Sequence, residues 1–586
     1  MERSVIFPSR LSSWLAIAVS LLVFALACGP GAEPTPTATP TKAPTQATPT
    51  PTRPAAVATP TPTTAAAPTP VATPSTQAKK GGTLHFVVGT FTPNFDPQLL
   101  SVTPEYYTTN GKLYLNLFVN YEGQNVECEI CSDKGWHLEN GGKTMVFDIR
   151  PGIKFHNGQE LTSADIAYSM KMVMGEIDGV VSPRAGVFKE YVQSIETPSK
   201  YVLRLNLIRP SVFVPKILAL SSASIYRDGT TREDLKKADS GAGPFIVKQV
   251  VTGSTWDLVR YPDYFKAGQP YLDAVNITYV ADANTRVAAF LTQKVEWTSN
   301  KQEQYRSQLL KLKEARTINW MPELGGCGPH FAKMNVTKPP FNDIRMRKAV
   351  NLAVDRVRIA KAMYGDDWSE QLLYFDQGQD YATPKEQIWN IVPGWGTGAK
   401  KQQEIEEAKQ LVKDAGYPTG LDIDQMARGP FTGTGYTNGH EVLQQSLKEI
   451  GIRTTLSVVD PTKHAERMAN LDYLIQWYIW CMTTRDADEV IGQYWITGGA
   501  RNTTGYSNPE VDKLYVQMSS ELDLAKRKQL FFQIQDIIVL KDVAYAPTPQ
   551  QDADFWIWPK VQGFMIPMTT HSGSGFHRAD RIWFKD

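Results

Sequence analysis

The sequence lacks the short motifs by which many enzymes are recognised. Its 586 residues contain no G-x-x-x-x-G-K-[ST] phosphate loop, no G-x-S-x-G elbow and no H-E-x-x-H motif, and the eight histidines are scattered singly. The stretches "DADEV" and "VADANT" lack the glycine and the glutamate of a calcium loop. We therefore expect no cofactor, no metal site and no catalysis. Two carboxylates far apart in the chain could still meet as a glycoside-hydrolase pair, which keeps a secreted carbohydrate-active enzyme as the alternative class.

The chain also lacks an excess of charge. With 61 Lys and Arg against 60 Asp and Glu, the formal net charge is +1, so no basic surplus exists to neutralise phosphates and we expect no nucleic-acid partner. Its length predicts two to four domains. Aromatic residues make up 10% of the chain, a share that suits both cores and ligand pockets.

One apolar run stands at the N-terminus. Arg3 and Arg10 precede the apolar residues 11–27, which are too few to span a bilayer comfortably and are typical of an export signal. Cys28 follows directly, and the site resembles a bacterial lipobox, although Ala25 and Leu26 exchange the usual order. We expect Cys28 to be lipidated and to anchor an exported protein to the outer face of the membrane; a retained N-terminal anchor is the alternative.

A long segment after Cys28 is almost free of bulky apolar side chains. Residues 28–79 are rich in Pro, Thr and Ala, a composition that cannot bury enough surface to offset the entropy of ordering. It predicts a disordered tether, partly in polyproline II conformation, and a candidate for O-glycosylation.

Cysteines are scarce as well. Apart from Cys28 the chain has Cys128, Cys131, Cys327 and Cys481, an even number that suggests two disulfides with three possible connectivities. The first two form a C-x-x-C pair, but no second such pair exists for zinc, and no βαβ pattern for redox chemistry surrounds it. A local disulfide is the better interpretation.

From residue 80 onward, strand and helix patterns alternate. Strands are predicted at 83–88, 144–150, 243–251 and 255–262, and helices at 161–174, 343–365 and 403–415. Thr162 or Ser163 can cap the first of these helices, and Gly416 ends the last. The pattern predicts a mixed α/β fold.

Six segments follow one another along the folded part of the chain: "GGTLHFVVGTFTPNFDP" (81–97), "TMVFDIRPGIKFHNGQELTSADIAYSMKMVM" (144–174), "GAGPFIVKQVVTGSTWDLVRYPDYF" (241–265), "MNVTKPPFNDIRMRKAVNLAVDR" (334–356), "AKQLVKDAGYP" (408–418) and "LFFQIQDIIVLKDVAYAP" (530–547). Taken in this order, they resemble the bacterial extracytoplasmic solute-binding proteins of family 5, the peptide and nickel group that serves ABC importers.

The resemblance implies a two-lobed type II periplasmic-binding-protein fold of the larger, three-domain kind. A discontinuous first lobe would comprise residues 80–325 and 545–586, with an extra subdomain at about 116–230, and the second lobe would span 326–544. A monomer would hold its solute between the lobes and deliver it to the permease subunits of an ABC importer. A solute-sensing role beside a receptor is a third possibility.

The resemblance also implies ligand-binding residues after the second lobe's central strand. Trp480 matches the family's cleft Trp, and Asp486 matches the Asp of an Asp-Pro pair, with Ala487 in place of Pro. Thr483 stands where peptide-binding members place an Asp for the peptide's amino group, which weakens the case for free-amine peptides. Arg485 and Asp486 either bind carboxylate or hydroxyl groups of the solute or pair with each other at the rim.

The first lobe and two neighbouring strands complete the implied site. Phe91, Thr92 and Asn94 lie in the loop where relatives line the cleft, and His330 either points into the cleft or faces away. Trp477 is expected in the core.

The implied pairing of the cysteines is Cys327 with Cys481, as in oligopeptide-type members, which leaves Cys128 with Cys131. The solute would be a peptide or a peptide-like molecule, with an oligosaccharide or a metal chelate as the alternative.

Overall fold

The structure is a computed structural model, and it describes residues 78–89, 95–99, 111–120, 126–237, 240–299, 303–323, 330–365, 368–375, 380–429, 434–480, 484, 486–550, 553–564 and 578–585. These all belong to one compact unit, Pro70–Asp586, and the other unit of the chain is Met1–Thr69. The predicted signal, Cys28 and nearly all of the tether therefore lie outside the described residues. Within the described residues, no helix is both long enough and apolar enough to cross a membrane.

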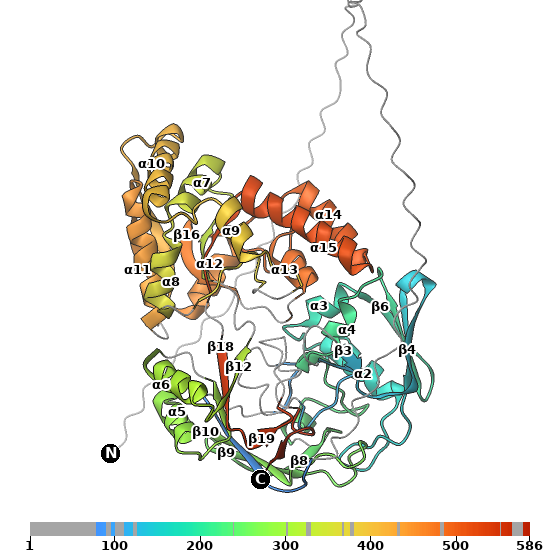
Figure 1. Cartoon of the computed structure of the whole chain (residues 1–586). Helices are drawn as coiled ribbons and strands as arrows, with labels where there is room; N and C mark the ends of the chain where they lie inside the picture. The colour runs from blue at the N-terminus through green and yellow to red at the C-terminus, as the bar shows by residue number, and fades with distance from the viewer. Residues whose placement is uncertain are drawn as a thin grey trace, which may run out of the picture. The chain divides into compact units, whose positions relative to one another are not determined.

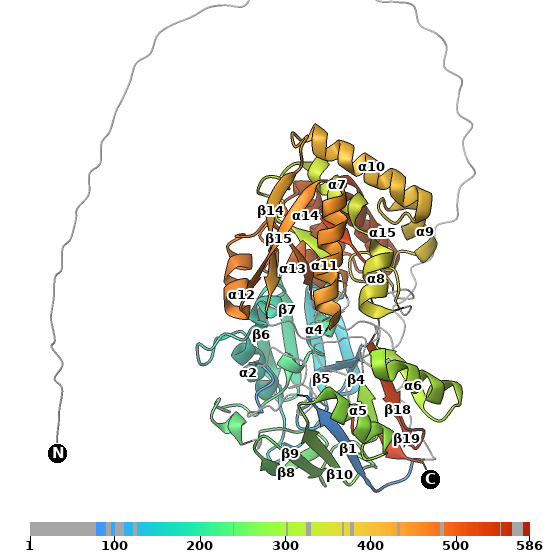
Figure 2. The same ribbon diagram turned by 90° about the vertical axis from the view of Figure 1, so that its left-hand side faces the viewer.

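The first folded strands build a four-stranded sheet in the order β1-β10-β9-β8 (Figure 2). Strand β1 (Thr83–Val88) runs parallel to β10 (Ala274–Tyr279), which pairs antiparallel with β9 (Thr255–Arg260), and β9 pairs antiparallel with β8 (Phe245–Val251). Leu84, Phe86 and Val88 alternate into the core, the period expected of a strand with one buried face.

The C-terminal segment returns to this part of the chain. Strand β18 (Ala553–Ile557) lies between β11 (Trp297–Ser299) and β12 (Asn319–Glu323), and β19 (Val561–Gln562) pairs with β20 (Trp583–Phe584). Helices α5 (Ala283–Leu291) and α6 (Glu303–Glu314) lie in the same region. We call residues 78–323 and 553–585 the first lobe, which is therefore discontinuous in sequence.

A second antiparallel sheet, in the order β4-β5-β7-β6, forms a subdomain of the first lobe (Figure 1). Its elements are β4 (Cys131–Glu139), β5 (Thr144–Ile149), β6 (Val192–Ser199), β7 (Val202–Leu207), α2 (Ser163–Val173), α3 (Ala185–Lys189) and α4 (Val214–Ile217). The predicted cap of α2 is present, because both the backbone N–H and the hydroxyl of Thr162 donate to Asp165 at 2.7 Å.

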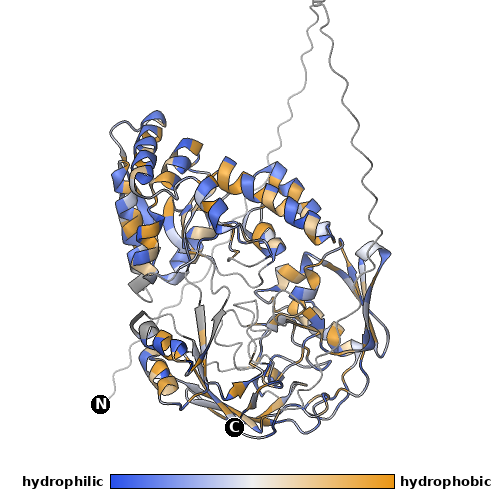
Figure 3. Cartoon of the chain, in the orientation of Figure 1, coloured by the Kyte–Doolittle hydropathy of each residue, from blue (hydrophilic) through white to orange (hydrophobic). Residues whose placement is uncertain are grey.

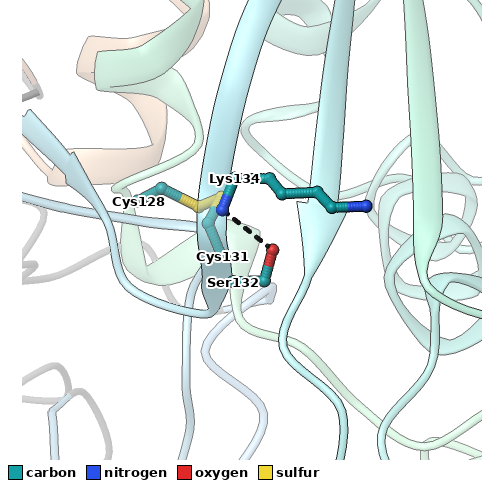
Figure 4. The surroundings of a disulfide bond; sticks show 4 residues. All are labelled: Cys128, Cys131, Ser132 and Lys134. Carbon is teal, nitrogen blue, oxygen red and sulfur yellow. Dashed lines mark hydrogen bonds between the residues drawn. A yellow bond between two sulfur atoms is a disulfide. The ribbon is translucent and has the colours of Figure 1, made fainter. Parts of the chain in front are cut away.

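The C-x-x-C pair lies where β3 (Val126–Cys128), which pairs with β2 (Phe118–Asn120), turns into β4. The structure joins Cys128 to Cys131 by a disulfide, with 5.5 Å between their Cα atoms (Figure 4). Beside it, the Lys134 backbone N–H donates to the Ser132 hydroxyl at 3.3 Å.

The remaining segment, residues 330–550, builds a five-stranded sheet that we call the second lobe. Its order is β15 (Ile452–Val459), β14 (Leu421–Arg428), β16 (Ile475–Ile479), β13 (His330–Met334) and β17 (Tyr545–Pro547). Its helices are α7 (Ile344–Ala353), α8 (Arg356–Tyr364), α9 (Lys385–Ile391), α10 (Gly398–Asp414), α11 (Thr434–Glu449), α12 (Pro461–Ala469), α13 (Ala487–Tyr494), α14 (Pro509–Ser520) and α15 (Leu524–Gln535). Helices such as α10 and α11 carry both polar and apolar residues, as helices with one buried face require (Figure 3).

Two details differ from the sequence predictions. The apolar spacing at 343–365 predicted one helical face, but α7 ends at Ala353 and α8 begins at Arg356. Asp355 causes the break, because its carboxylate accepts the Arg358 N–H at 2.9 Å and starts a new helix. Strand β17 pairs with β13, so residues 545–547 still belong to the second-lobe sheet, although the returning segment was expected to begin at 545.

Candidate functional site

The carboxyl ends of β14 and β16 meet at one edge of the second-lobe sheet. Strands β14 and β16 are parallel, and β13 is antiparallel to β16, with His330 opposite Ile479. The chain therefore enters β13 at the edge where it leaves β16. Ligands of open α/β sheets bind at such edges, outside the carboxyl ends of the strands. Of the sequence-predicted residues of the second lobe, His330 begins β13 at this edge and Trp480 directly follows β16 there.

Several predicted residues lie outside the described residues. They are Phe91, Thr92 and Asn94 of the first lobe, Thr483 and Arg485 after β16, and Cys327 and Cys481.

His330 begins β13 and is partly buried. Its Nδ1 lies 2.8 Å from the Tyr364 hydroxyl, and its ring is parallel to the indole of Trp477 with 5.7 Å between ring centroids. Trp477 is fully buried, as the sequence predicted. The imidazole is thus held between two aromatic side chains, which fixes its orientation at the sheet edge.

Trp480 directly follows β16 and belongs to an aromatic cluster. Its ring stacks on Tyr494 at 4.4 Å and contacts Phe331 at 4.7 Å, and only 5% of the residue is exposed. Most of the indole is therefore covered by the protein, so a solute that met Trp480 here would meet little more than its edge.

Lys333 lies on β13 beneath the same cluster and is fully buried. Its ammonium lies over the rings of Tyr473, Tyr478 and Trp480 at 5.2, 4.8 and 5.3 Å, and it donates to the Thr503 hydroxyl. Burial lowers its pKa well below the usual value. Three aromatic rings, the Thr503 hydroxyl and the Met468 sulfur surround the amino group, and no carboxylate of the described residues is paired with it.

Asp486 was expected either to bind the solute or to pair with Arg485 at the rim of the cleft, and the structure places it among buried ion pairs instead. Only 1% of the residue is exposed, and it caps α13 by accepting the Asp488 N–H at 3.0 Å. Arg527 donates to both Asp486 and Asp488, the latter at 2.8 Å, and Lys216 donates to Asp486 at 2.6 Å. Burial opposes the charged form of Asp486, but Arg527 and Lys216 outweigh it and lower the pKa of Asp486.

Asp488 has a different electrostatic balance from its neighbour. Burial and the charge of Asp486 raise its pKa, and Arg527 acts against the rise. We call these two acids with Arg527 and Lys216 the Asp486 cluster. Because Lys216 belongs to the first-lobe subdomain and the other three to the second lobe, the cluster joins the lobes.

Further polar contacts join the two lobes beside the Asp486 cluster. Glu190 accepts hydrogen bonds from Arg209 and Tyr515, both at 2.7 Å, and from Gln493 at 3.5 Å. The hydroxyls of Tyr191 and Tyr515 are hydrogen-bonded at 3.2 Å. We call these contacts and the Asp486 cluster the interlobe interface; it lies where α3 and α4 meet α13 and α14 (Figure 1).

Sequence reasoning missed the residues that hold this interface. Lys216 and Arg527 lie 270 and 41 positions from Asp486, so no local pattern relates them to it. The start of α13 did carry a signal. Asp486 followed by Asp488 and Glu489 is an N-cap residue with acids in the first turn, which predicts a helix rather than a rim loop.

The described part of the site offers no nucleophile activated by a neighbouring base. Within the same residues, no group of three His, Cys, Asp or Glu side chains is placed to hold a metal ion. Its acidic side chains are paired with cationic ones, and its aromatic side chains pack together. Such an arrangement can hold a molecule between two lobes.

The family of the chain follows from comparison with known proteins. Residues 132–502 match the family model described as bacterial extracellular solute-binding proteins, family 5 Middle, so the chain belongs to this family. The heme-binding protein A of Haemophilus influenzae is 23% identical over 531 residues, covering 84% of this chain and 92% of that protein. The dipeptide-binding protein of Escherichia coli is 23% identical over 515 residues, covering 81% and 91%.

The fold has solved counterparts. The periplasmic binding protein DppA of Helicobacter pylori, in complex with the peptide STSA, superposes with a TM-score of 0.69 at 22% identity, covering 87% of this chain and 99% of that one. The predicted type II binding-protein fold is confirmed. The protein is a solute-binding protein and not an enzyme, and its family is extracellular.

Proposed function

We propose that this protein is a lipid-anchored binding protein that captures a peptide or peptide-like solute between its lobes and delivers it to an ABC importer. The observation that supports this most is the interlobe interface, because Lys216 of the first lobe reaches Asp486, which ends the loop after β16. A solute at that loop would touch both lobes. Contact with both lobes favours the closed form, and closure is the signal that an importer can recognise.

The binding residues that we propose are those predicted from the sequence: Phe91, Thr92, Asn94, His330, Trp480, Thr483 and Arg485. Asp486 would act through its ion pairs rather than by direct contact. The pairing of Cys327 with Cys481 is supported by the register, because His330 and Ile479 are opposite each other, and the two cysteines stand three residues before the one and two residues after the other in the sequence. A non-reducing peptide map that joins either cysteine to Cys128 or Cys131 would contradict it.

Relatives support more than one kind of solute. The E. coli relative is named for dipeptides and the H. influenzae relative for heme, which is a metal chelate. Thr483 brings no charge to the place where a peptide amine would find a carboxylate, and this favours a blocked peptide or another peptide-like molecule.

The proposal is tested by measuring melting temperature. The full chain with Cys28→Ser would be screened by thermal shift against peptides, oligosaccharides, heme and nickel chelates, because a ligand that binds only the folded state raises the melting temperature. We expect one class to raise it. Turnover of a glycan without any such shift would overturn the proposal in favour of the enzyme alternative.

The peptide assignment has a sharper test at one position. Thr483→Asp should raise the affinity for peptides with a free amine, because it supplies a charge-assisted hydrogen bond to the ammonium. Thr483→Asn, which has the same shape without the charge, is the control. No gain in the Asp variant would favour a non-peptide solute.

A further inference from the structure

Each acidic side chain at the interlobe interface has a cationic partner. Asp486 and Asp488 are matched by Arg527 and Lys216, as described above. Glu190 is matched by Arg209 at 2.7 Å. Glu489 accepts from the N–H and the hydroxyl of Thr484, and it faces Arg501 at 3.8 Å. After this pairing, one cation among the interface residues that the structure describes has no carboxylate.

That cation is Arg184, at the start of α3. The residue is 6% exposed, and its Nε is buried without a hydrogen-bond partner. Across the described chain, no ion pair or hydrogen bond reaches its guanidinium. Only its backbone is hydrogen-bonded there: the N–H donates to the Ser182 hydroxyl at 3.1 Å, and the carbonyl accepts the Val187 N–H at 3.1 Å. A buried guanidinium without an anion is costly, and proteins rarely keep one unless an anion arrives.

The position of Arg184 places it opposite α13. Glu190, at the other end of α3, contacts Gln493 of α13, and the next residue of α13 is Tyr494, which stacks on Trp480. Arg501 donates to the Tyr494 hydroxyl at 2.7 Å. Burial raises the pKa of Tyr494 to about 12, and the charges of Arg501 and Arg184 act against the rise.

We propose that Arg184 is a solute-binding residue of the first lobe that takes a carboxylate of the solute when the lobes close. This inference rests on the proposed function and narrows its solute class to molecules that carry a carboxylate. Counted over the described residues, the surplus at the interface is one positive charge, which one carboxylate would neutralise, whereas a phosphate would bring nearly two negative charges. The planar guanidinium can also meet a carboxylate with two parallel hydrogen bonds.

The test compares Arg184→Met with Lys189→Met in the full chain carrying Cys28→Ser. Lys189 lies on the same helix and is exposed, so its variant removes one positive charge without touching the interface. The probes are a tripeptide mixture with free C-terminal carboxylates and the same mixture as C-terminal amides, with affinities measured by equilibrium dialysis and mass spectrometry.

We expect the unsubstituted protein to bind the acids at least tenfold more tightly than the amides. Arg184→Met should weaken the acids by about 10- to 100-fold and change the amides by less than about threefold. Without solute, the same variant should melt at a higher temperature, because it removes an uncompensated buried charge. Lys189→Met should change none of these. A merely structural Arg184 would instead lower the melting temperature and both affinities together.

The inference is overturned if the acids bind no better than the amides, or if Arg184→Met keeps its affinity for the acids. Binding of amides, oligosaccharides or chelates with no preference for acids would reject the role of Arg184 and leave the proposed function standing. Failure of every solute to bind the unsubstituted protein would reject both.

Discussion

Two buried charge clusters have the same composition and different places in the fold. In the first lobe, Arg578 lies 2.5 Å from Glu129 and 2.7 Å from Asp580, and Lys266 lies 3.0 and 3.3 Å from the same two acids. We call this the Asp580 cluster. The Asp486 cluster also has two acids, one arginine and one lysine.

The difference lies in what each cluster connects. All four members of the Asp580 cluster belong to the first lobe, where they fasten the returning C-terminal segment to residues 129 and 266. In the Asp486 cluster one member, Lys216, comes from the other lobe. A cluster within one lobe contributes to folding, whereas a cluster shared by two lobes can also set how far they close. Two clusters of equal composition can therefore have different functions.

The largest effect is expected from Asp580→Asn. The change leaves Arg578 and Lys266 buried with one acid instead of two, which should cost about 3–5 kcal/mol in the free energy of unfolding. Urea unfolding would measure it. The matched control is Asp273→Asn, because Asp273 is 63% exposed and pairs with Arg260 at 2.7 Å, so its loss should cost less than about 1 kcal/mol. Equal costs for the two variants would mean that the Asp580 cluster does not hold the lobe.

Lys216→Met should have a smaller effect on stability and a larger one on closure. Asp486 keeps Arg527, so the expected cost is about 1–2 kcal/mol in the free energy of unfolding. Because the lost bond crosses the interlobe interface, backbone amides of α4 and α13 should exchange hydrogen for deuterium faster. Lys200→Met is the control, since Lys200 pairs with Glu160 at 2.7 Å inside the subdomain and is 55% exposed. Unchanged exchange in α13 would show that Lys216 does not hold the lobes together.

Local features of the fold could be predicted from sequence, and long-range ones could not. Thr162 and Gly416 bound their helices as expected, because capping depends on residues within one turn. The break at Asp355 was missed, because the apolar spacing runs on through residues 343–365 and hides a cap in its middle. The interlobe interface was out of reach, since its partners, such as Glu190 and Tyr515, are joined only by the tertiary fold.

The same limit applies to the candidate site. The order of the family segments indicated which loop follows β16, so Trp480 and Asp486 were both expected on that loop of the second lobe. The burial of Trp480 and Asp486 was not expected, because the sequence does not distinguish an aromatic or acidic residue that lines a pocket from one that belongs to the core. No sequence pattern predicts a role for Arg184. The residue is identified only from the structure, after each charge around it has been matched with a partner.

The smallest expected effect is a difference in pH dependence between Asp486 and Asp488, the two acids of the Asp486 cluster. The pKa of Asp486 is lowered, so its contribution to stability is present above the unfolded pKa of about 3.9 and is lost as the pH falls through the lower folded value. The pKa of Asp488 is raised, so its ionised form costs free energy at neutral pH.

We therefore expect Asp488→Asn to change the free energy of unfolding by less than about 1 kcal/mol at pH 7, since it also takes one partner from Arg527. Asp486→Asn, two residues away at the start of the same helix, should cost more than Asp488→Asn at pH 7, and the difference should shrink as the pH is lowered below 4. Urea unfolding between pH 3 and 7 would measure both. A larger cost for Asp488→Asn would mean that Arg527 holds α13 mainly through Asp488, and that Lys216 and Asp486 form a pair whose task is closure alone.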